Sequence, residues 1–136
     1  MRPGKMLIDA NIFLEILLDQ EKSENCKIIL RKIQVGEKKG FISTFSIDTI
    51  ILAMVRNKVP ISKIKIFLDS LKNLKGLSLY NVNFKDRILA LDLIKKYNLD
   101  YEDAITLQSA ISSNCKEILS LDKHFDRAKL IKRVEP

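Results

Sequence analysis

The segment Lys-Met-Leu-Ile-Asp-Ala-Asn at residues 5–11 decides how this sequence folds. Residues 5–9 are a short, mostly apolar run that ends in Asp9, which is typical of a buried β-strand. Residues 10–18 follow without a break and have their large apolar side chains at the spacing of one helical face. A strand followed directly by a helix is the repeating unit of an α/β fold.

The same alternation of strands and helices continues to the C-terminus. Further strands are predicted at residues 41–44, 77–82, 116–122 and 130–134. Further helices are predicted at residues 23–35, 46–57, 62–73, 84–98 and 100–114. Four of these helices have a potential capping side chain at the start, namely Ser23, Ser62, Asn83 and Asp100.

Strands that are separated by helices pair in parallel, because the chain must cross back over the sheet between them. We therefore expect an α/β fold: a three-layer α/β/α sandwich with a mainly parallel central sheet of four or five strands. The two consecutive helices between the second and third strands predict a helical layer that is thicker on one side. No linker or break in composition divides the chain, so residues 1–136 are expected to form a single domain.

The composition excludes some classes of protein. Of the 136 residues, 46% are hydrophobic and only four are glycine and three proline, which argues against a disordered or low-complexity chain. The net charge of +7 favours a polyanionic partner: nucleic acid first, an acidic membrane surface second and an acidic protein third. A lysine-rich proteome explains the charge equally well, so the charge alone assigns no partner.

Cys26 and Cys115 stand among apolar neighbours, so buried free thiols are expected rather than a disulfide framework. The first residues lack the apolar stretch of a signal peptide, and no apolar run reaches the length that spans a membrane. These features predict a cytoplasmic protein without a membrane partner.

Four acids lie where predicted strands end or where the following helices start. Asp9 and Asp122 come directly after apolar strands, and Asp48 and Asp103 lie on the first turns of helices. Helices that follow parallel strands start at the carboxyl edge of the sheet, where ligands bind in open α/β folds. Neighbouring strands are only about 4.8 Å apart, so these acids can converge on one edge.

Several converging carboxylates repel one another unless a cation lies between them. Oxygen ligands with water in the remaining positions suit Mg²⁺ or Mn²⁺. Such an ion can activate water and neutralise the charge on a phosphodiester during hydrolysis. This chemistry needs no histidine base, which fits a chain with a single histidine.

Each acid also has a purely structural explanation. Asp9 can cap the helix after it, and Asp48 can complement a helix dipole. Asp103 lies three residues after Asp100, as in a capping box, and Asp122 can cap a turn. For any one of these acids, the structural explanation is better than a role in a shared site. When the four acids are considered together, two of them after apolar strands, a shared site becomes an equally good explanation.

Four stretches of the chain resemble the motifs of PIN-domain nucleases, in the family's order and over residues 6–126. Leu-Ile-Asp-Ala-Asn at 7–11 is similar to the opening strand that ends in Asp-x-Asn/Thr/Ser. Ile-Ser-Thr-Phe-Ser-Ile-Asp at 42–48 is similar to a serine-started strand end with an acid on the next helix. Leu-Asp-Tyr-Glu-Asp-Ala at 99–104 and Leu-Ser-Leu-Asp-Lys-His-Phe at 119–125 resemble the third and fourth motifs.

The resemblance implies a set of site residues. The catalytic acids would be Asp9, Asp48, Asp103 and Asp122, of which Asp9, Asp103 and Asp122 would bind the metal ion, Mg²⁺ or Mn²⁺. Supporting residues would be Asn11, Ser120 and Asp126. The family usually has Glu at position 48, and Asp48 is one methylene shorter, which reduces its reach by roughly 1.5 Å.

Small PIN proteins of this length resemble VapC-type toxins, which are endoribonucleases, often dimeric, and are inhibited by an antitoxin. The resemblance therefore implies RNA as the substrate, a possible antitoxin partner and a homodimer, with apolar residues of the 62–73 helix suited to the dimer contact. Lys123 and Arg127 are the candidates for binding RNA phosphates near Asp122.

Two other functions are compatible with such a chain. The first is a non-catalytic PIN-like module that binds RNA or protein, which the departure at Asp48 favours. The second is a receiver-like phosphate switch, which needs an acid pair at the first strand; acids spread over four segments disfavour it.

Overall fold

The computed structural model describes residues 5–136; residues 1–4 of the predicted domain lie outside the described part. Five parallel strands form one sheet in the order β3-β2-β1-β4-β5, which confirms the predicted fold class. Their bounds are Lys5–Ile8 for β1, Lys39–Ser43 for β2, Leu77–Tyr80 for β3, Glu117–Leu119 for β4 and Lys132–Val134 for β5.

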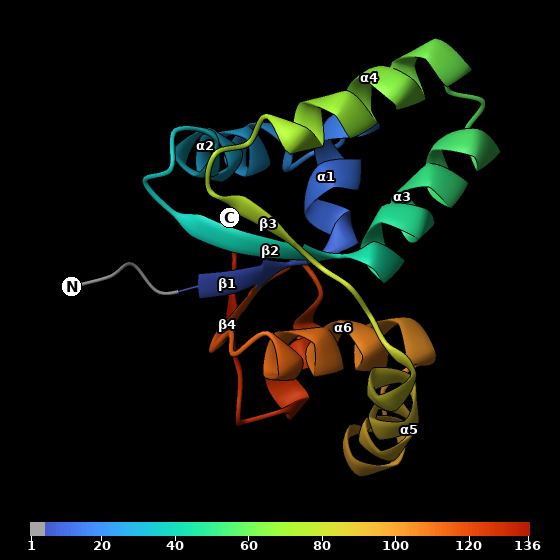
Figure 1. Ribbon diagram of the computed structural model, residues 1–136, viewed down its shortest axis with the longest axis vertical. Helices are drawn as coiled ribbons and strands as arrows, with labels where there is room; N and C mark the ends of the chain where they lie inside the picture. Colours follow the sequence, from blue (N-terminus) through green and yellow to red (C-terminus); the bar gives the residue numbers. More distant parts are fainter. Residues whose placement is uncertain (1–4) are drawn as a thin grey trace.

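The helices cover both faces of the sheet (Figure 1). One layer consists of α1 (Ala10–Leu17), α2 (Ser23–Gln34), α3 (Thr44–Arg56) and α4 (Ile61–Lys72). The other consists of α5 (Phe84–Tyr97), α6 (Tyr101–Ser112) and the short 3₁₀ helix η1 (Lys123–Arg127). The first layer is the thicker one, as the consecutive helices between β2 and β3 predict. None of the described helices is long and apolar enough to cross a membrane.

Strand β1 is buried on both faces, which is why its sequence is a continuous apolar run. Met6 and Ile8 pack into the core under α1 to α4, whereas Leu7 packs into the core under α5 and α6. Side chains of a strand alternate between faces, so this one strand anchors both hydrophobic cores.

The order of the strands places a topological reversal point at the carboxyl ends of β1 and β4. The chain adds β2 and β3 on one side of β1 and then crosses to place β4 and β5 on the other side. The first helix after β1 and the helix before β4 therefore cover opposite faces. Such a reversal point is where ligands bind in open α/β sheets.

Of the four predicted capping side chains, two are confirmed and two are wrong. Asn83 and Asp86 form a complete capping box at α5, and the Asp100 side chain caps α6. However, α2 begins at Ser23 itself, so the Ser23 hydroxyl lies inside the first turn, and it has no hydrogen-bond partner within the described residues. Ser62 likewise lies inside α4, since Pro60 takes the capping position and fixes the entry into the helix.

Helix α3 begins at Thr44, two residues earlier than predicted, because the Ser43 hydroxyl accepts a hydrogen bond from the backbone N–H of Ser46 and caps the helix. Asp48 therefore lies on the second turn of α3 rather than on its first turn. This places the carboxylate of Asp48 farther along the helix from the sheet edge than the sequence suggests.

Candidate active site

Pairing of β1 with β4 brings Asp9 and Ser120 together. Ile8 lies opposite Leu119, and the backbone N–H of Asp9 donates to the Leu119 carbonyl at 3.0 Å, which extends the pairing by one residue. The Ser120 hydroxyl then donates to Oδ2 of Asp9 at 2.7 Å. Two residues that are 111 positions apart in the sequence thus meet at the reversal point of the sheet.

The Ser120 hydroxyl connects further residues to Asp9. It accepts a hydrogen bond from Asn11 Nδ2 at 3.2 Å and another from the backbone N–H of Asp122 at 2.9 Å. The Asn11 side chain oxygen also accepts from the backbone N–H of Leu121 at 3.4 Å. Asn11 and Ser120 therefore form a bridge that fixes the first acid relative to the last.

The Asp9 carboxylate does not serve as a helix cap. Asp9 occupies the N-cap position of α1, but its side chain makes no capping hydrogen bond. It is only 7% exposed. Burial raises the pKa of Asp9 to about 7; the Ser120 hydrogen bond opposes this rise, and the negative charge of Asp103 adds to it.

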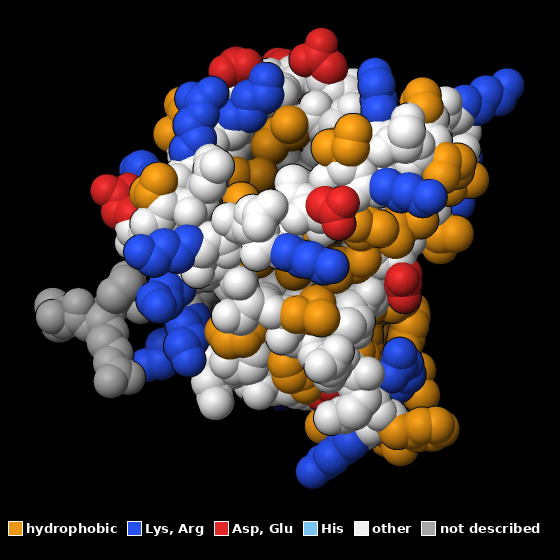
Figure 2. Space-filling view, turned by 45° about the horizontal axis from the view of Figure 1, so that its top comes forward, with side chains coloured by type: hydrophobic (Ala, Val, Ile, Leu, Met, Phe, Trp, Pro, Cys, Tyr) orange, Lys and Arg blue, Asp and Glu red, His pale blue; other side chains and the backbone are white. Residues whose placement is uncertain are grey.

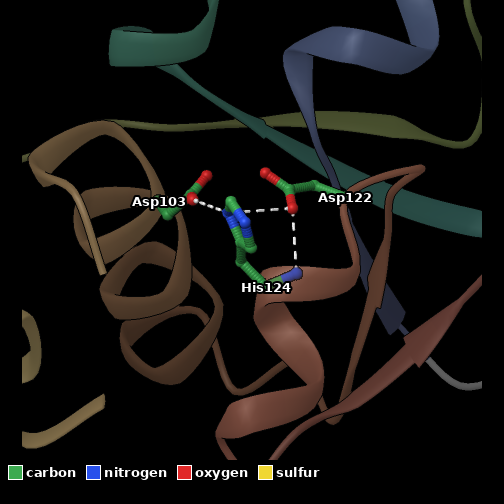
Figure 3. Close-up of side chains that lie close together, drawn as sticks. All are labelled: Asp103, Asp122 and His124. Atoms are coloured by element: carbon green, nitrogen blue, oxygen red, sulfur yellow. Dashed lines mark hydrogen bonds and ion pairs between the residues drawn. The ribbon is translucent and has the colours of Figure 1, made fainter. Parts of the chain in front are cut away.

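Asp103 and Asp122 approach each other across His124 (Figure 3). The Nδ1 atom of His124 lies 3.3 Å from Oδ2 of Asp103 and 3.1 Å from Oδ1 of Asp122. One potential ligand atom from each of the three residues lies within 4.8 Å of the other two. Asp122 also accepts a hydrogen bond from the backbone N–H of His124 at 2.9 Å. Its carboxylate therefore caps η1 and also belongs to the cluster formed by Asp103, Asp122 and His124.

Asp103 is placed by the start of α6. The Asp100 side chain accepts a hydrogen bond from the backbone N–H of Asp103 at 2.8 Å and fixes the first turn of the helix. Burial, followed by the charges of Asp122 and Asp100, raises the pKa of Asp103 to about 6, while the hydrogen bond with His124 lowers it. The pKa values of Asp9 and Asp103 are thus both raised by burial and by neighbouring acids.

Glu102 and His124 belong to this region although the sequence analysis assigned neither to the site. Burial and the charges of Asp100 and Asp122 raise the pKa of Glu102, and Glu102 in turn raises the pKa of Asp9. A signal for Glu102 was its place beside Asp103 at a helix start. For His124 the sequence offered only its place two residues after Asp122.

None of the remaining predicted residues belongs to the closely spaced group of Asp103, Asp122 and His124 in the described part of the chain. Asp48 is exposed on α3 and makes no ion pair within the described residues. The Asp126 carboxylate pairs with Arg133 at 3.0 Å, and the Arg127 guanidinium donates to the Asn98 carbonyl at the end of α5 at 2.6 Å. Lys123 is exposed at the start of η1, next to the cluster in sequence.

The three acids that converge lack a cationic partner from lysine or arginine. In the described part of the chain, neither kind of side chain lies within 4.0 Å of a carboxylate oxygen of Asp9, Asp103 or Asp122. Oxygen donors with uncompensated negative charge are the ligand set that a hard divalent cation such as Mg²⁺ or Mn²⁺ requires. These three side chains therefore fit a metal site.

The fold and the site define a class of protein: a three-layer α/β/α domain with a carboxylate cluster at the reversal point of a parallel sheet. The model of the PIN domain family matches residues 6–130 of the chain. The chain therefore belongs to the PIN domain family. A search of curated protein sequences finds no match.

Three solved structures share the fold over nearly the whole chain. VapC20 of Mycobacterium tuberculosis, a toxin that cleaves the sarcin–ricin loop, aligns with a TM-score of 0.75 and 10% identity, covering 96% of this chain and 99% of its own. VapBC2 of Rickettsia felis, bound to a promoter DNA fragment, aligns with a TM-score of 0.69 and 14% identity, covering 96% and 98%. A toxin–antitoxin complex from Klebsiella pneumoniae aligns with a TM-score of 0.68 and 16% identity, covering 93% and 94%.

Proposed function

We propose that the protein is a metal-dependent endoribonuclease that hydrolyses RNA phosphodiester bonds. The observation that carries the proposal is the close spacing of Asp103 and Asp122 beside Asp9, whose pKa the charge of Asp103 helps to raise, with no lysine or arginine among the described residues to neutralise the three acids. The membership in the PIN domain family supports it. The two buried free cysteines suit a reducing compartment such as the cytoplasm, where RNA is available.

In this proposal Asp9, Asp103 and Asp122 bind Mg²⁺ or Mn²⁺. The ion supplies an activated water and neutralises charge on the phosphodiester. Ser120 and Asn11 hold the Asp9 carboxylate in place through the hydrogen bonds described above. Asp48 is the fourth acid of the proposal, acting from the edge of the site.

The RNA backbone needs cationic contacts outside the acidic cluster. Lys123 is the better placed of the two predicted contacts, since it is exposed and directly follows Asp122. The guanidinium group of Arg127 is engaged with the end of α5, so its contribution to RNA binding is expected to be smaller.

The test of the proposed activity is incubation of the purified protein with a structured RNA in the presence of Mn²⁺, Mg²⁺ or excess EDTA. We expect endonucleolytic fragments with either metal and none with EDTA. Cleavage that persists in excess EDTA would contradict a metal-dependent mechanism.

The exposed position of Asp48 favours one alternative, a PIN-like module that binds RNA or protein without cleaving it. This alternative predicts RNA binding that weakens steeply with salt, because phosphate contacts displace counterions, and no cleavage with any divalent metal. A filter-binding titration at two salt concentrations, run beside the cleavage assay, separates the two functions.

We further propose that the protein is the toxin of a toxin–antitoxin pair. Its structural neighbours from Klebsiella pneumoniae and Rickettsia felis are toxin–antitoxin assemblies. An apolar hollow between α1, α2 and α4 offers a surface for a partner helix, lined by residues that include Phe13, Leu17, Leu30, Phe67 and Leu71. The test is co-purification with the product of the neighbouring reading frame and loss of RNA cleavage in the complex.

A homodimer is the second proposed assembly. Figure 2, which looks obliquely onto the layer of α1 to α4, shows hydrophobic side chains exposed between those of lysine and arginine. Ile66 on α4 is 67% exposed, and α5 carries a stripe formed by Phe84, Ile88 and Leu91, with Phe84 83% exposed. Contiguous apolar exposure marks an interaction surface. Sedimentation equilibrium of the wild type and of Phe84→Asp tests whether this stripe holds two copies together.

A further inference from the structure

We propose that His124 is a nitrogen ligand of the metal ion, acting together with Asp103 and Asp122, and that the site therefore prefers Mn²⁺ to Mg²⁺. The inference rests on the proposed metal site and assigns it a ligand other than the three carboxylates. It follows from the position of the imidazole ring between two acids (Figure 3).

The distances match those between neighbouring ligands of one ion. A hard or borderline divalent metal has bonds of about 2.1 Å, so adjacent ligand atoms in an octahedral arrangement lie about 3.0 Å apart. The Nδ1 atom of His124 lies 3.1 Å from Oδ1 of Asp122 and 3.3 Å from Oδ2 of Asp103. The three potential ligand atoms all lie within 4.8 Å of one another, a spacing compatible with binding one ion.

The backbone presents the ring to the acids. The N–H of His124 donates to Oδ1 of Asp122 at 2.9 Å, which ties the residue to the segment that follows β4. Phe125 next to it is fully buried and anchors η1 in the core under α6. The ring itself stays accessible, since the His124 side chain is 54% exposed, so a metal ion can reach Nδ1 from solvent.

Two roles for His124 fit the distances, and they respond in opposite ways to its removal. As a ligand, the neutral ring donates its lone pair to the metal, and its removal weakens metal binding. As a protonated counter-ion, the ring occupies the place of the metal, and its removal strengthens metal binding. The fit to one coordination sphere, with both acids contacting the same nitrogen, favours the ligand.

A nitrogen ligand changes which metal the site prefers. Mg²⁺ binds through oxygen ligands and water, whereas imidazole suits first-row transition metals better. An Asp-Asp-His set therefore favours Mn²⁺ over Mg²⁺ more strongly than three carboxylates do. The preference is a property of the protein alone and needs no RNA to be measured.

The test uses electron paramagnetic resonance to measure Mn²⁺ binding to the full chain without RNA. Competition with Mg²⁺ in the same assay measures the affinity for Mg²⁺. We expect pulsed spectra of bound Mn²⁺ to show coupling to a ¹⁴N nucleus in the wild type. His124→Gln should remove the coupling, weaken Mn²⁺ binding by roughly 10-fold or more, as loss of metal-site groups does, and weaken Mg²⁺ binding less. Lys123→Gln is the matched control, because it removes a neighbouring cation but no ligand.

Several results would overturn the inference. The first is that the wild type binds no Mn²⁺, and the second is that its bound Mn²⁺ shows no coupling to nitrogen. The third is that His124→Gln binds Mn²⁺ as tightly as the wild type or more tightly while its circular dichroism spectrum stays native. Bound Mn²⁺ without nitrogen coupling leaves the proposed nuclease standing. Nitrogen coupling in a protein that cleaves no RNA contradicts the proposed function and leaves this inference standing.

Discussion

Two groups of buried acids in this molecule show opposite behaviour. Asp86, at the start of α5, is 3% exposed, and its carboxylate accepts hydrogen bonds from the hydroxyl groups of Tyr80 and Ser112, each at 2.6 Å. The backbone N–H of Asn83 donates to it as well. Burial raises the pKa of Asp86, but the hydrogen bonds from Ser112 and Tyr80 outweigh it and hold the pKa below its usual value.

Asp9 and Asp103 are each 7% exposed, nearly as buried as Asp86, yet their pKa values are raised. One side-chain donor, Ser120, serves the Asp9 carboxylate, and in the described residues the only side chain that bonds the Asp103 carboxylate is His124. Hydrogen-bond donors outweigh burial at Asp86, whereas burial and neighbouring negative charges outweigh the donors at Asp9 and Asp103. A buried carboxylate with enough hydrogen-bond donors stabilises the fold by linking its elements. A buried carboxylate with too few donors can instead be stabilised by a bound cation.

The largest expected effect is on activity. Asp103→Asn removes a proposed metal ligand and one negative charge, so RNA cleavage should fall by about 1,000-fold or more, which corresponds to about 4 kcal/mol of lost transition-state stabilisation. Its melting temperature should stay unchanged or rise, because the repulsion is relieved. Asp69→Asn, at an exposed position of α4, is the control and should leave both quantities unchanged. Cleavage by Asp103→Asn at the wild-type rate would contradict its role.

The metal-free protein should lose stability as the pH rises. The pKa of Asp9 is about 7 in the folded chain against 3.8 ordinarily, so the folded state binds the proton more tightly than the unfolded state. Stability falls between about pH 4 and pH 7 and the loss is complete above pH 7, by about 4 kcal/mol for Asp9. Urea unfolding in EDTA at pH 5 and pH 8 measures most of this difference.

Asp9→Asn should flatten this pH profile, and saturating Mn²⁺ should restore stability at pH 8. Asp86 acts in the opposite sense: because its pKa is lowered, its contribution is present above the unfolded pKa and is lost only as the pH falls through the folded value. A metal-free wild type that becomes more stable from pH 5 to pH 8 would disprove the assignment of Asp9 as an uncompensated acid.

Asp86→Ala should destabilise the fold by about 3 kcal/mol, because it removes a buried carboxylate that accepts three hydrogen bonds and leaves the hydroxyl donors of Tyr80 and Ser112 without their acceptor. The free energy of unfolding from urea titrations measures the loss. Asp92→Ala, at an exposed position of the same helix, serves as the control and should change stability by less than about 0.5 kcal/mol. Equal effects of the two substitutions would show that the hydrogen-bond network contributes nothing.

Ser120→Ala should lower metal affinity and RNA cleavage by roughly 10- to 100-fold, because Asp9 loses the hydroxyl that orients it and opposes the rise of its pKa. Ser109→Ala is a matched control: Ser109 is equally buried, and its hydroxyl donates to the Ile105 carbonyl within α6. Calorimetric titration with Mn²⁺ compares the two variants. A similar loss in both would indicate a general packing effect.

The smallest effect is expected at Asp48. Asp48→Asn should lower cleavage by no more than about 10-fold, about 1.4 kcal/mol, because this side chain is exposed and lies outside the closely spaced group. Asp48→Glu lengthens the side chain and should keep or raise the rate. Initial rates on the same RNA decide this, and complete loss of cleavage in Asp48→Asn would place Asp48 among the essential acids.

The fold was predictable because its main signals are local. Apolar runs of strand length and helical spacing of apolar residues fix the elements, and Asn83 and Asp100 mark helix starts with bonds that span three residues. Ser23 and Ser62 carry the same local signal, but the N-cap position lies one residue earlier, at Lys22, in α2 and two residues earlier, at Pro60, in α4. Local propensity does not distinguish adjacent starts.

The site was only partly predictable for a similar reason. That Asp9 and Asp122 follow neighbouring strands at one sheet edge could be predicted, because the alternation of elements implies parallel strands. The hydrogen bond between Arg133 and Asp126, and the contact of His124 with Asp103 across 21 positions, depend on tertiary packing and side-chain rotamers. No spacing in the sequence encodes them.

The most direct test of the central claim is the anomalous difference map of a crystal soaked in Mn²⁺. A shared ion site predicts one strong peak at the carboxyl ends of β1 and β4, within about 2.5 Å of carboxylate oxygens from Asp103 and Asp122 and on the side that faces Asp9. A fully occupied Mn²⁺ elsewhere, with these three acids free of metal, would contradict the account.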